Sequence, residues 1–589
     1  MLNCAGGEDW FGQICKHTHY WNLLFFAFGI GRGASLMEGD GGLRPWSHLL
    51  PSGVSADYRP PVGTLNALMA PGWVDHASRL AIEYYGEQWT YADLHARVAQ
   101  TASALCARGI ARGDVVALYL PNTNWQPVWF LAVLAAGATV VNLSPLDAPR
   151  ELTHKMADSG ARWLVSVDGD SYLSRVATLK QQFPDLVVVT CDDAMTPTGT
   201  VPDHAVRHAD LVADHKGAQL PDVPVAPDDI ALLQYTGGTT GLPKAAILSQ
   251  RNIAAAVQSY SELFRGEPQF GPDQRALVYT PLFHIFGLTT SLLRRLSEGA
   301  GIYLRQRFDA AEALNLIHEK RITTFGGVPT MWIGLLQQPD LETKDLSSIN
   351  YAISGGAPLP VAVARRVREL MGVNIRGGWG MTETSPVGIN IPATLPPGKD
   401  GTVGIPVPGI DIQIVAADDP RRLLGPGERG ELRVRGPSVT RGYWNRPEET
   451  RDAFVDGWLM TGDIGYMDDD GYFYIVDRKK DMIVSSGFNV YPVAIERAVH
   501  EHPSVVDVAV IGIPDPYRGE AAKAFVVLRE GAAEFSLEEL REFLADRLGR
   551  QEMPQQLEFR SALPRTAVGK TSRLELREQE RDRHATTSN

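Results

Sequence analysis

The sequence predicts an α/β fold for most of the chain, followed by a smaller α+β unit. From Trp89 onward, short apolar runs alternate with segments whose apolar residues recur at helical spacing. Strands that alternate with helices in this way are typical of parallel sheets covered by helices on both faces. Around residues 401–442 the pattern changes to short alternating stretches rich in Gly and Pro, which indicates a small antiparallel β unit.

Hydrophobic periodicity places the individual elements in order. Residues 115–120 (VVALYL) form an apolar run of strand length, whereas residues 90–107 repeat apolar side chains three and four positions apart. The same criteria predict helices at 125–136, 151–159 and 252–263, and strands at 139–143, 163–167, 232–236, 245–248, 410–415 and 431–434. After Arg478 they predict helices at 493–500 and 537–547 and strands at 505–511 and 524–528.

Length and composition limit the class of protein. At 589 residues the chain exceeds one hydrophobic core, since domains usually hold roughly 100–200 residues. The formal net charge of −13 argues against a nucleic-acid partner, which normally meets a basic face. The four cysteines are widely spaced and form no CxxC pair, so neither a disulfide framework nor a zinc site is expected.

Both ends of the chain are expected to lie outside the folded domains. We expect residues 1–43 to be an irregular extension and residues 577–589, which are charged and polar, to be a disordered tail. The apolar run at 23–31 is shorter than the ~20 residues of a membrane span, and a signal peptide is the less favoured alternative to a cytoplasmic protein. The GIGRGA at 29–34 matches a dinucleotide pattern, but glycines and Pro45 would interrupt the helix that must follow it.

The strongest chemical signal is the segment at 235–244, YTGGTTGLPK. Its glycines allow successive backbone N–H groups to turn toward one point, and threonine hydroxyls and the Lys244 ammonium add donors. This composition predicts a phosphate-binding loop, with a Gly-rich hairpin turn as the alternative. It is not a Walker A loop, because Lys244 follows Pro243 and is followed by Ala245 rather than Ser or Thr.

TGGTTGLPK resembles the phosphate-binding signature of the adenylate-forming superfamily, which includes acyl-CoA synthetases, luciferases and the adenylation domains of peptide synthetases. The resemblance continues in order through SGGAP at 354–358, GWGMTET at 378–384, TGD at 461–463, DRKKD at 477–481, GFNVYP at 487–492 and PRTAVGK at 564–570. Residues 456–464 and 476–492 are most similar to bacterial medium- and long-chain fatty acid–CoA ligases.

The resemblance implies a domain organisation. A large AMP-binding domain at 44–476 would contain two stacked mixed or parallel sheets with helices and the small β unit. A hinge at 477–480 would join it to a mobile small α+β domain at 481–576. Lys480 matches the hinge position, where a few backbone torsions would absorb the domain rotation between two half-reactions; a basic turn is the alternative.

The resemblance also assigns roles in nucleotide binding. Glu383 and Thr236 would hold Mg²⁺, which prefers oxygen ligands. Asp463 would accept hydrogen bonds from the ribose hydroxyls, and Arg478 would make a second ribose or phosphate contact. Trp379, where many relatives carry Tyr, would stack on adenine, with a buried core tryptophan as the alternative. The predicted ATP and CoA contacts are Thr236, Gly237, Gly238, Thr239, Thr240, Lys244, Gly356, Ala357, Trp379, Gly380, Thr382, Asp463, Arg478, Lys480, Gly487 and Lys570.

Four residues are implied in catalysis: Lys570, His284, Lys244 and Glu383. Lys570 would stabilise the charge that builds on the α-phosphate when a carboxylate attacks it. His284 would lie beside the acyl group without acting as a base, because a carboxylate is already ionised at pH 7; a satisfied core histidine is the alternative. Thr571 and Ser572 are more polar than is usual after this lysine in the family.

The resemblance therefore implies that ATP, with Mg²⁺, activates a carboxylic acid to an acyl-adenylate, which CoA then converts to an acyl-CoA. A medium- or long-chain fatty acid is expected, while dicarboxylic and aryl acids stay open. The alternatives are a fatty acyl-AMP ligase that loads a carrier protein, a non-catalytic acyl or nucleotide sensor, and an oxidative luciferase-type activity. We expect no nucleic acid and at most peripheral contact with the inner membrane face, and we leave a homodimer open.

Overall fold

The computed structural model describes residues 44–195, 201–236, 243–267, 270–355, 359, 361–392, 395–396, 398–485, 488–566 and 570–587. From Trp46 onward the chain forms one compact unit. The predicted N-terminal extension at 1–43 lies outside the described residues. Within the described ranges, no helix has both the length and the apolar character needed to cross a membrane.

The first large sheet has seven strands in the order β7-β6-β5-β3-β4-β8-β9. Their bounds are β3 Val115–Tyr119, β4 Thr139–Asn142, β5 Trp163–Val167, β6 Val187–Cys191, β7 Ala205–Arg207, β8 Ile230–Thr236 and β9 Lys244–Ser249. All neighbours are parallel except β8 and β9, which are antiparallel and joined by the predicted phosphate loop.

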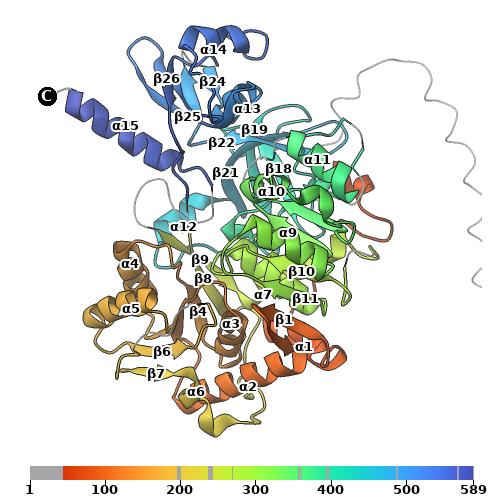
Figure 1. Cartoon of the computed structure of the whole chain (residues 1–589), viewed down its shortest axis with the longest axis vertical. Helices are drawn as coiled ribbons and strands as arrows, with labels where there is room; N and C mark the ends of the chain where they lie inside the picture. Colours follow the sequence, from red (N-terminus) through yellow and green to blue (C-terminus); the bar gives the residue numbers. More distant parts are fainter. Residues whose placement is uncertain are drawn as a thin grey trace, which may run out of the picture. The chain divides into compact units, whose positions relative to one another are not determined.

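Helices cover both faces of this sheet (Figure 1). In β3, Val116 and Leu118 belong to the core shared with α2 (Tyr91–Ala107) and α3 (Trp125–Ala135). Ala117 and Tyr119 belong to a second core with α4 (Pro149–Ser159) and α5 (Asp170–Gln182). Successive strand side chains point to opposite faces, so the unbroken apolar run at 115–120 is what a sheet buried on both sides requires.

The second large sheet also has seven strands, in the order β14-β13-β12-β10-β11-β1-β2, and is parallel except between β1 and β2. Its strands are β1 Leu80–Tyr84, β2 Glu87–Thr90, β10 Arg275–Val278, β11 Gly301–Leu304, β12 Thr324–Gly327, β13 Tyr351–Ser354 and β14 Ile375–Arg376. Side chains of both sheets meet in one hydrophobic core with α1 (Leu65–Asp75) and α7 (Gln250–Leu263). Two large mixed sheets with helices confirm the predicted fold class.

Other helices complete the second sheet. They are α9 Ala310–Glu319, α10 Pro329–Leu336 and α11 Val361–Met371, with the short helices α6 His208–Leu211 and α8 Arg294–Ser297 elsewhere. Side chains of α9 and α10 form a separate core with β10 and β12.

The small antiparallel unit is larger than the sequence predicts. Its strands are β18 Asp411–Val415, β19 Gly430–Arg435, β20 Phe454–Val455, β21 Trp458–Met467 and β22 Phe473–Arg478, with α12 at Pro447–Ala453. Beside it, β15 Gly378–Trp379, β16 Ile389–Asn390 and β17 Ile405–Pro406 form a three-stranded sheet. Side chains from both sheets share one core, which includes Trp379 and Leu459.

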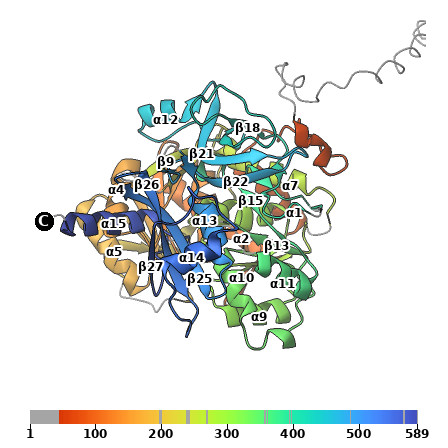
Figure 2. The ribbon, with the colours of Figure 1, turned by 90° about the horizontal axis from the view of Figure 1, so that it is seen from above.

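The described residues after Arg478 form five strands and three helices. They are β23 Ile483–Ser485, β24 Phe488–Val490, β25 Val505–Asp515, β26 Gly519–Leu528, β27 Gln556–Phe559, α13 Pro492–His500, α14 Leu537–Leu544 and α15 Arg573–Thr587. Figure 2 shows α13, α14 and α15 together with β25, β26 and β27. The predicted α+β pattern after Arg478 is therefore present. Ser536 begins α14 with a capping box that includes Glu539.

The expectation of a disordered tail from residue 577 is wrong for residues 577–587, which belong to α15. Leu576 is buried against the C-terminal sheet, and Glu580 on the same helix pairs with the buried Lys523 at 2.8 Å. The charges that suggest a solvated tail are instead partnered by residues far away in the chain, which composition alone does not reveal.

Candidate functional site

The predicted phosphate loop joins the adjacent ends of β8 and β9. Thr236 ends β8, Lys244 begins β9, and the two residues are directly opposite in the antiparallel register. The Thr236 hydroxyl donates a hydrogen bond to the Lys244 carbonyl oxygen, at 3.4 Å. The loop residues Gly237, Gly238, Thr239 and Thr240 lie outside the described residues, as do Gly356, Ala357 and Gly487, so their assignments stay predictions.

Glu383 and Lys244 lie near each other at one end of the site. Glu383 is 6% exposed, and its Oε1 accepts a 2.8 Å hydrogen bond from the Tyr443 hydroxyl. The Lys244 ammonium sits 3.6 Å from the centre of the same tyrosine ring. Burial lowers the pKa of Lys244, and the Glu383 charge opposes that shift. Burial, and then the Glu383 charge, raise the pKa of Tyr443.

Tyr443 is a site residue that the sequence analysis missed. It lies in a segment that pairs with β9 through Ala246, so the sheet edge brings it to Lys244. Its only sequence signal is the apolar GYW at 442–444, which resembles an ordinary edge strand.

The residues around Glu383 fit a magnesium ion. With Oε1 bonded to Tyr443, the second carboxylate oxygen can still act as a ligand. Across the described ranges, no cluster of three or more His, Cys, Asp or Glu side chains could hold a metal by protein ligands alone. Mg²⁺ usually binds through one or two carboxylates, water and substrate phosphates, and a single buried glutamate suits that mode.

Gly380 has a structural reason to be glycine. A Cβ at this position would lie 1.5 Å from the Pro386 carbonyl oxygen. The close approach closes the loop that carries Thr382 and Glu383, which form the turn Thr382–Thr384. Any side chain at 380 would therefore move Glu383.

Asp463 is the centre of the other end of the site. It is 2% exposed; its Oδ2 accepts a 2.7 Å hydrogen bond from Trp379 Nε1, and its Oδ1 pairs with Arg478 Nε at 2.6 Å. Asp463 and Arg478 face each other because β21 and β22 are antiparallel in this register. Burial raises the pKa of Asp463, although Arg478, the Trp379 hydrogen bond and Lys570 each lower it.

Trp379 is largely inside the protein. Its side chain is 9% exposed and packs in the core of the small β unit with Val387 and Ile389. A Cβ at Gly388 would lie 2.6 Å from its ring. The alternative of a buried core tryptophan therefore describes its packing, and the indole N–H is directed to Asp463.

The small domain brings Lys570 to this end of the site. The Lys570 charge lowers the pKa of both Asp463 and His284, so the ammonium lies within electrostatic range of these two residues. Burial, and then Arg478, lower the pKa of Lys570, while Asp463 opposes the shift. Its backbone is held by Thr566, whose N–H donates to the Lys570 carbonyl at 2.7 Å and whose hydroxyl accepts from the Lys570 N–H at 3.2 Å.

The polar residues after Lys570 are used in local structure. The Thr571 hydroxyl accepts a 3.0 Å hydrogen bond from Arg565, which itself pairs with Asp507. The Ser572 hydroxyl accepts from the Glu575 N–H at the start of α15. These bonds fix the Lys570 hairpin to the β25 strand and to α15.

His284 is held in one orientation. Its Nδ1 accepts a 3.2 Å hydrogen bond from the Phe286 N–H, and burial, and then Lys570, lower its pKa to about 4. The ring is therefore neutral near pH 7 and carries its proton on Nε2, where it can donate a hydrogen bond.

The chain continues in a π-helical turn, Gly287–Leu293, which the sequence analysis missed. A Cβ at Gly287 would lie 2.2 Å from the Pro281 carbonyl oxygen.

Lys480 lies beside a group of ion pairs at the predicted hinge. Burial, and then Arg478, lower its pKa. Arg573 of α15 pairs with Asp477 at 3.4 Å, with Asp481 at 3.3 Å and with Glu496 at 2.6 Å. Burial raises the pKa of Asp477 to about 6, although Arg573 opposes the shift. Sequence analysis missed Arg573, because its partners are 77 to 96 residues away in the chain.

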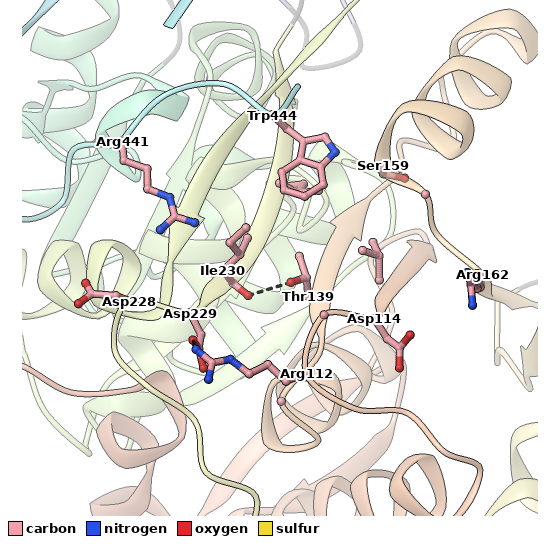
Figure 3. A pocket seen from close by; sticks show the side chains of 15 residues that line it. Arg112, Asp114, Thr139, Ser159, Arg162, Asp228, Asp229, Ile230, Arg441 and Trp444 are labelled. Atoms are coloured by element: carbon pink, nitrogen blue, oxygen red, sulfur yellow. Dashed lines mark hydrogen bonds and ion pairs between the residues drawn. The ribbon is translucent and has the colours of Figure 1, made fainter. Parts of the chain in front are cut away.

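A separate cavity of about 480 Å³ lies at the N-terminal ends of several strands of the first sheet, away from the phosphate loop. Figure 3 shows the residues that line it. Val115, Thr139 and Ile230, which line it, begin β3, β4 and β8, whereas Thr236 ends β8. Three arginines and three aspartates line it, so their formal charges balance, and Arg112 is paired with Asp229. It is not part of the candidate site.

Comparison with known proteins identifies the family. Residues 73–444 match the AMP-binding enzyme family, and residues 494–570 match the AMP-binding enzyme C-terminal domain. The chain belongs to the AMP-binding enzyme family. A long-chain-fatty-acid–CoA ligase of Bacillus subtilis is 35% identical over 558 residues, which is 92% of this chain and 99% of the relative. A feruloyl-CoA synthase of an Amycolatopsis species is 35% identical over 497 residues, 84% of this chain and 95% of the relative.

Solved structures agree with this assignment. ATP-bound MatB from Rhodopseudomonas palustris superposes with a TM-score of 0.78 at 31% identity, covering 88% of this chain and 99% of that chain. This AMP-binding enzyme is therefore an AMP-forming acid–thiol ligase, with ATP, Mg²⁺ and CoA as the small molecules it uses.

Proposed function

We propose that this enzyme converts a medium- or long-chain fatty acid, ATP and CoA into acyl-CoA, AMP and pyrophosphate. The observation that carries the proposal is the position of Lys570. The Lys570 charge lowers the pKa of His284 and of Asp463, and Asp463 is itself buried and held by Trp379 and Arg478. Lys570, Asp463 and His284 could then act together on ATP and the acid in the first half-reaction, the formation of the acyl-adenylate.

In the first half-reaction, an oxygen of the fatty carboxylate attacks the α-phosphorus and the bond to pyrophosphate breaks. Asp463 would bind the ribose and Lys244 would neutralise the departing phosphates. Glu383 would hold Mg²⁺, which would supply further positive charge there. The Lys570 ammonium stabilises the charge on the α-phosphoryl oxygens as it develops. His284, neutral and protonated on Nε2, donates a hydrogen bond to the reacting groups and accepts no proton.

In the second half-reaction, the small domain turns about Lys480. The CoA thiol, after losing its proton, attacks the carbonyl carbon of the adenylate, and AMP leaves with the phosphate oxygen. Lys570 moves away with its domain and takes no part in this step. The position of Lys480 in the chain supports the hinge role. It stands between Arg478, which pairs with Asp463, and Asp481, which pairs with Arg573.

The apolar side chains near the expected acyl pocket support a fatty acid. Phe286 is the nearest neighbour of a Cβ built at Gly355, at 3.5 Å, and Ile353 of one built at Gly326, also at 3.5 Å. Met331 approaches Gly327 in the same way. These side chains would contact a hydrocarbon chain favourably, whereas a second carboxylate would lose hydration there. The B. subtilis relative, named for long-chain fatty acids, agrees with this choice.

The test is an acid panel with the full-length enzyme. Octanoate, decanoate and palmitate would be compared with malonate, ferulate and anthranilate, measuring pyrophosphate release and acyl-CoA formation separately. We expect the fatty acids to give the highest kcat/KM and both products in equal amounts. A preference for malonate or an aryl acid would overturn the substrate class. Pyrophosphate release with transfer only to a holo-carrier protein would favour the acyl-AMP ligase, and no release with any acid would favour a sensor.

A further inference from the structure

Trp379 and Asp463 form a contact that the proposed function does not yet use. The indole Nε1–H donates to Asp463 Oδ2 at 2.7 Å, and Arg478 Nε meets the other oxygen, Oδ1, at 2.6 Å. The Asp463 N–H also donates to the Thr461 hydroxyl, at 3.1 Å, which fixes the backbone of the same residue. The carboxylate is therefore held from both oxygens and from its own main chain.

The burial of Trp379 limits what its ring can do. The side chain is 9% exposed and is enclosed by the core of the small β unit, where Gly388 leaves room for the ring. Most of the ring surface therefore contacts protein side chains rather than solvent. A hydrogen-bond donor needs only that its N–H be directed to the acceptor, and that condition is met.

We infer that Trp379 is a positioning residue, which orients the Asp463 carboxylate for the two ribose hydroxyls of ATP. The inference rests on the proposed adenylation, because it assumes that Asp463 binds the ribose. Each oxygen of an ionised carboxylate has two acceptor sites. Trp379 takes one site on Oδ2 and Arg478 one on Oδ1, so one site on each oxygen remains for a hydroxyl.

The consequence is selectivity for the sugar. When both donors fix the plane of the carboxylate, the two free acceptor sites match a pair of neighbouring hydroxyls. Without the Trp379 donor the carboxylate can rotate about the remaining Arg478 pair, and the match is lost. A hydrogen bond to a charged group typically contributes a factor of about 10 to 100 in an equilibrium constant.

The direct test is ATP binding without acid or CoA, measured by calorimetry on the full-length enzyme. Trp379→Phe keeps an aromatic ring and removes the donor. We expect it to weaken ATP binding about 10- to 100-fold and to bind 2′-deoxy-ATP and 3′-deoxy-ATP nearly as well as ATP. The matched control is Trp458→Phe. Trp458 is equally buried, 8% exposed, on the same strand as Asp463, but contacts Arg433 and Arg435 instead. It is expected to keep wild-type selectivity.

Asp463→Asn probes the same contact from the acceptor side. It can be measured even if Trp379→Phe does not fold, and retained ribose selectivity in this variant would overturn the inference. We expect it to lose the selectivity for ribose, and adding Trp379→Phe to it should weaken ATP binding by less than a factor of two, because residues that act through one another are not additive. Equal extra losses in both backgrounds would overturn the inference. A further outcome would also overturn the inference: Trp379→Phe binds ATP like the wild type, while Trp379→Leu does not bind ATP. That pattern would indicate that the ring acts by stacking. Failure of the proposed function looks different, since the wild-type enzyme would then release no pyrophosphate.

Discussion

The two ends of the candidate site are built differently. At the Glu383 end, Lys244, Tyr443 and Glu383 all belong to the large domain and contact one another through a strand edge and a tight loop. At the Asp463 end, Trp379 lies in the region that matches the AMP-binding enzyme family and Lys570 in the region that matches its C-terminal domain. Asp463 and Arg478 lie between these regions in the sequence. One end lies within a single matched region, and the other combines residues of both.

This difference matches the chemistry that each end is proposed to perform. Holding the triphosphate and its metal requires fixed groups, whereas a lysine that serves only the first half-reaction has to leave before a thiol can enter. The ion pairs of Arg573 join Asp477, in the predicted hinge, to Glu496 in α13. Four substitutions would break or sharpen this comparison.

The largest effect is expected from Arg573→Met. It removes the cation that Asp477, Asp481 and Glu496 share, although Asp481 keeps Arg577. Leaving a buried carboxylate such as Asp477 without its partner typically costs about 3–5 kcal/mol. Hydrogen exchange of β25 and β26 should report this loss in the small domain, with the β8–β9 region unchanged. The matched control, Arg583→Met, removes more exposed pairs on the same helix and should cost at most about 1 kcal/mol. An equal loss in both sheets would mean that the two ends are not independent.

Lys570→Ala should affect one half-reaction. Removing one preorganised cation from the developing charge is expected to slow adenylate formation by about 10²–10³. Thioester formation from supplied acyl-AMP should stay within a few-fold of wild type. The two halves are measured separately, by pyrophosphate release and by acyl-CoA formation, with the surface variant Lys344→Ala as control. Equal loss in both halves would remove Lys570 from its assigned role.

Tyr443→Phe should weaken the binding of magnesium-ATP at the Glu383 end of the site. The hydroxyl donates to a buried, charged Glu383, so its loss is expected to cost about 1.5–3 kcal/mol of magnesium-ATP binding. A magnesium titration of the adenylation rate should shift to higher concentration, and the rate at saturating magnesium should recover. Tyr517→Phe removes an exposed hydroxyl and should leave the titration unchanged. An unshifted titration for Tyr443→Phe would separate Tyr443 from the metal.

His284→Gln should leave the shape of the activity profile between pH 6 and 8 unchanged. Because the pKa of His284 is lowered to about 4, its ring stays neutral throughout this range. Its effect on stability has the opposite sign to that of a histidine paired with a carboxylate, whose pKa is raised. The unfolded chain takes up a proton near pH 6.5 and the folded chain only near pH 4, so stability is fully present above pH 6.5 and falls as the pH decreases toward 4. The variant should lose less stability over that window. A profile that loses its acid limb in the variant would show that His284 titrates during turnover.

Much of this site can be predicted from sequence because its motifs are local. The glycine-rich loop at 235–244, the GWGMTE segment and the PRTAVGK segment each carry their functional residue within a few positions, and the family resemblance orders them. The alternation of apolar runs likewise predicts both large sheets, since a strand buried on both faces must be apolar along its length.

Other features depend on residues that only folding brings together. Tyr443 meets Glu383 across 60 residues, Arg573 meets Asp477 across 96, and Lys523 meets Glu580 across 57. Such pairs leave no periodic signal, which is why α15 resembles a solvated tail in composition.

The sequence by itself therefore determines the family, the order of the elements and the chemical type of each motif. The tertiary structure decides which groups act on one another. It buries the Trp379 ring in a core while directing its N–H to Asp463, and it brings Lys570 within electrostatic range of His284. The physical reason is that residue type and spacing set what a side chain can donate or accept, whereas burial and the partner that satisfies it are set by strands and helices distant in the chain.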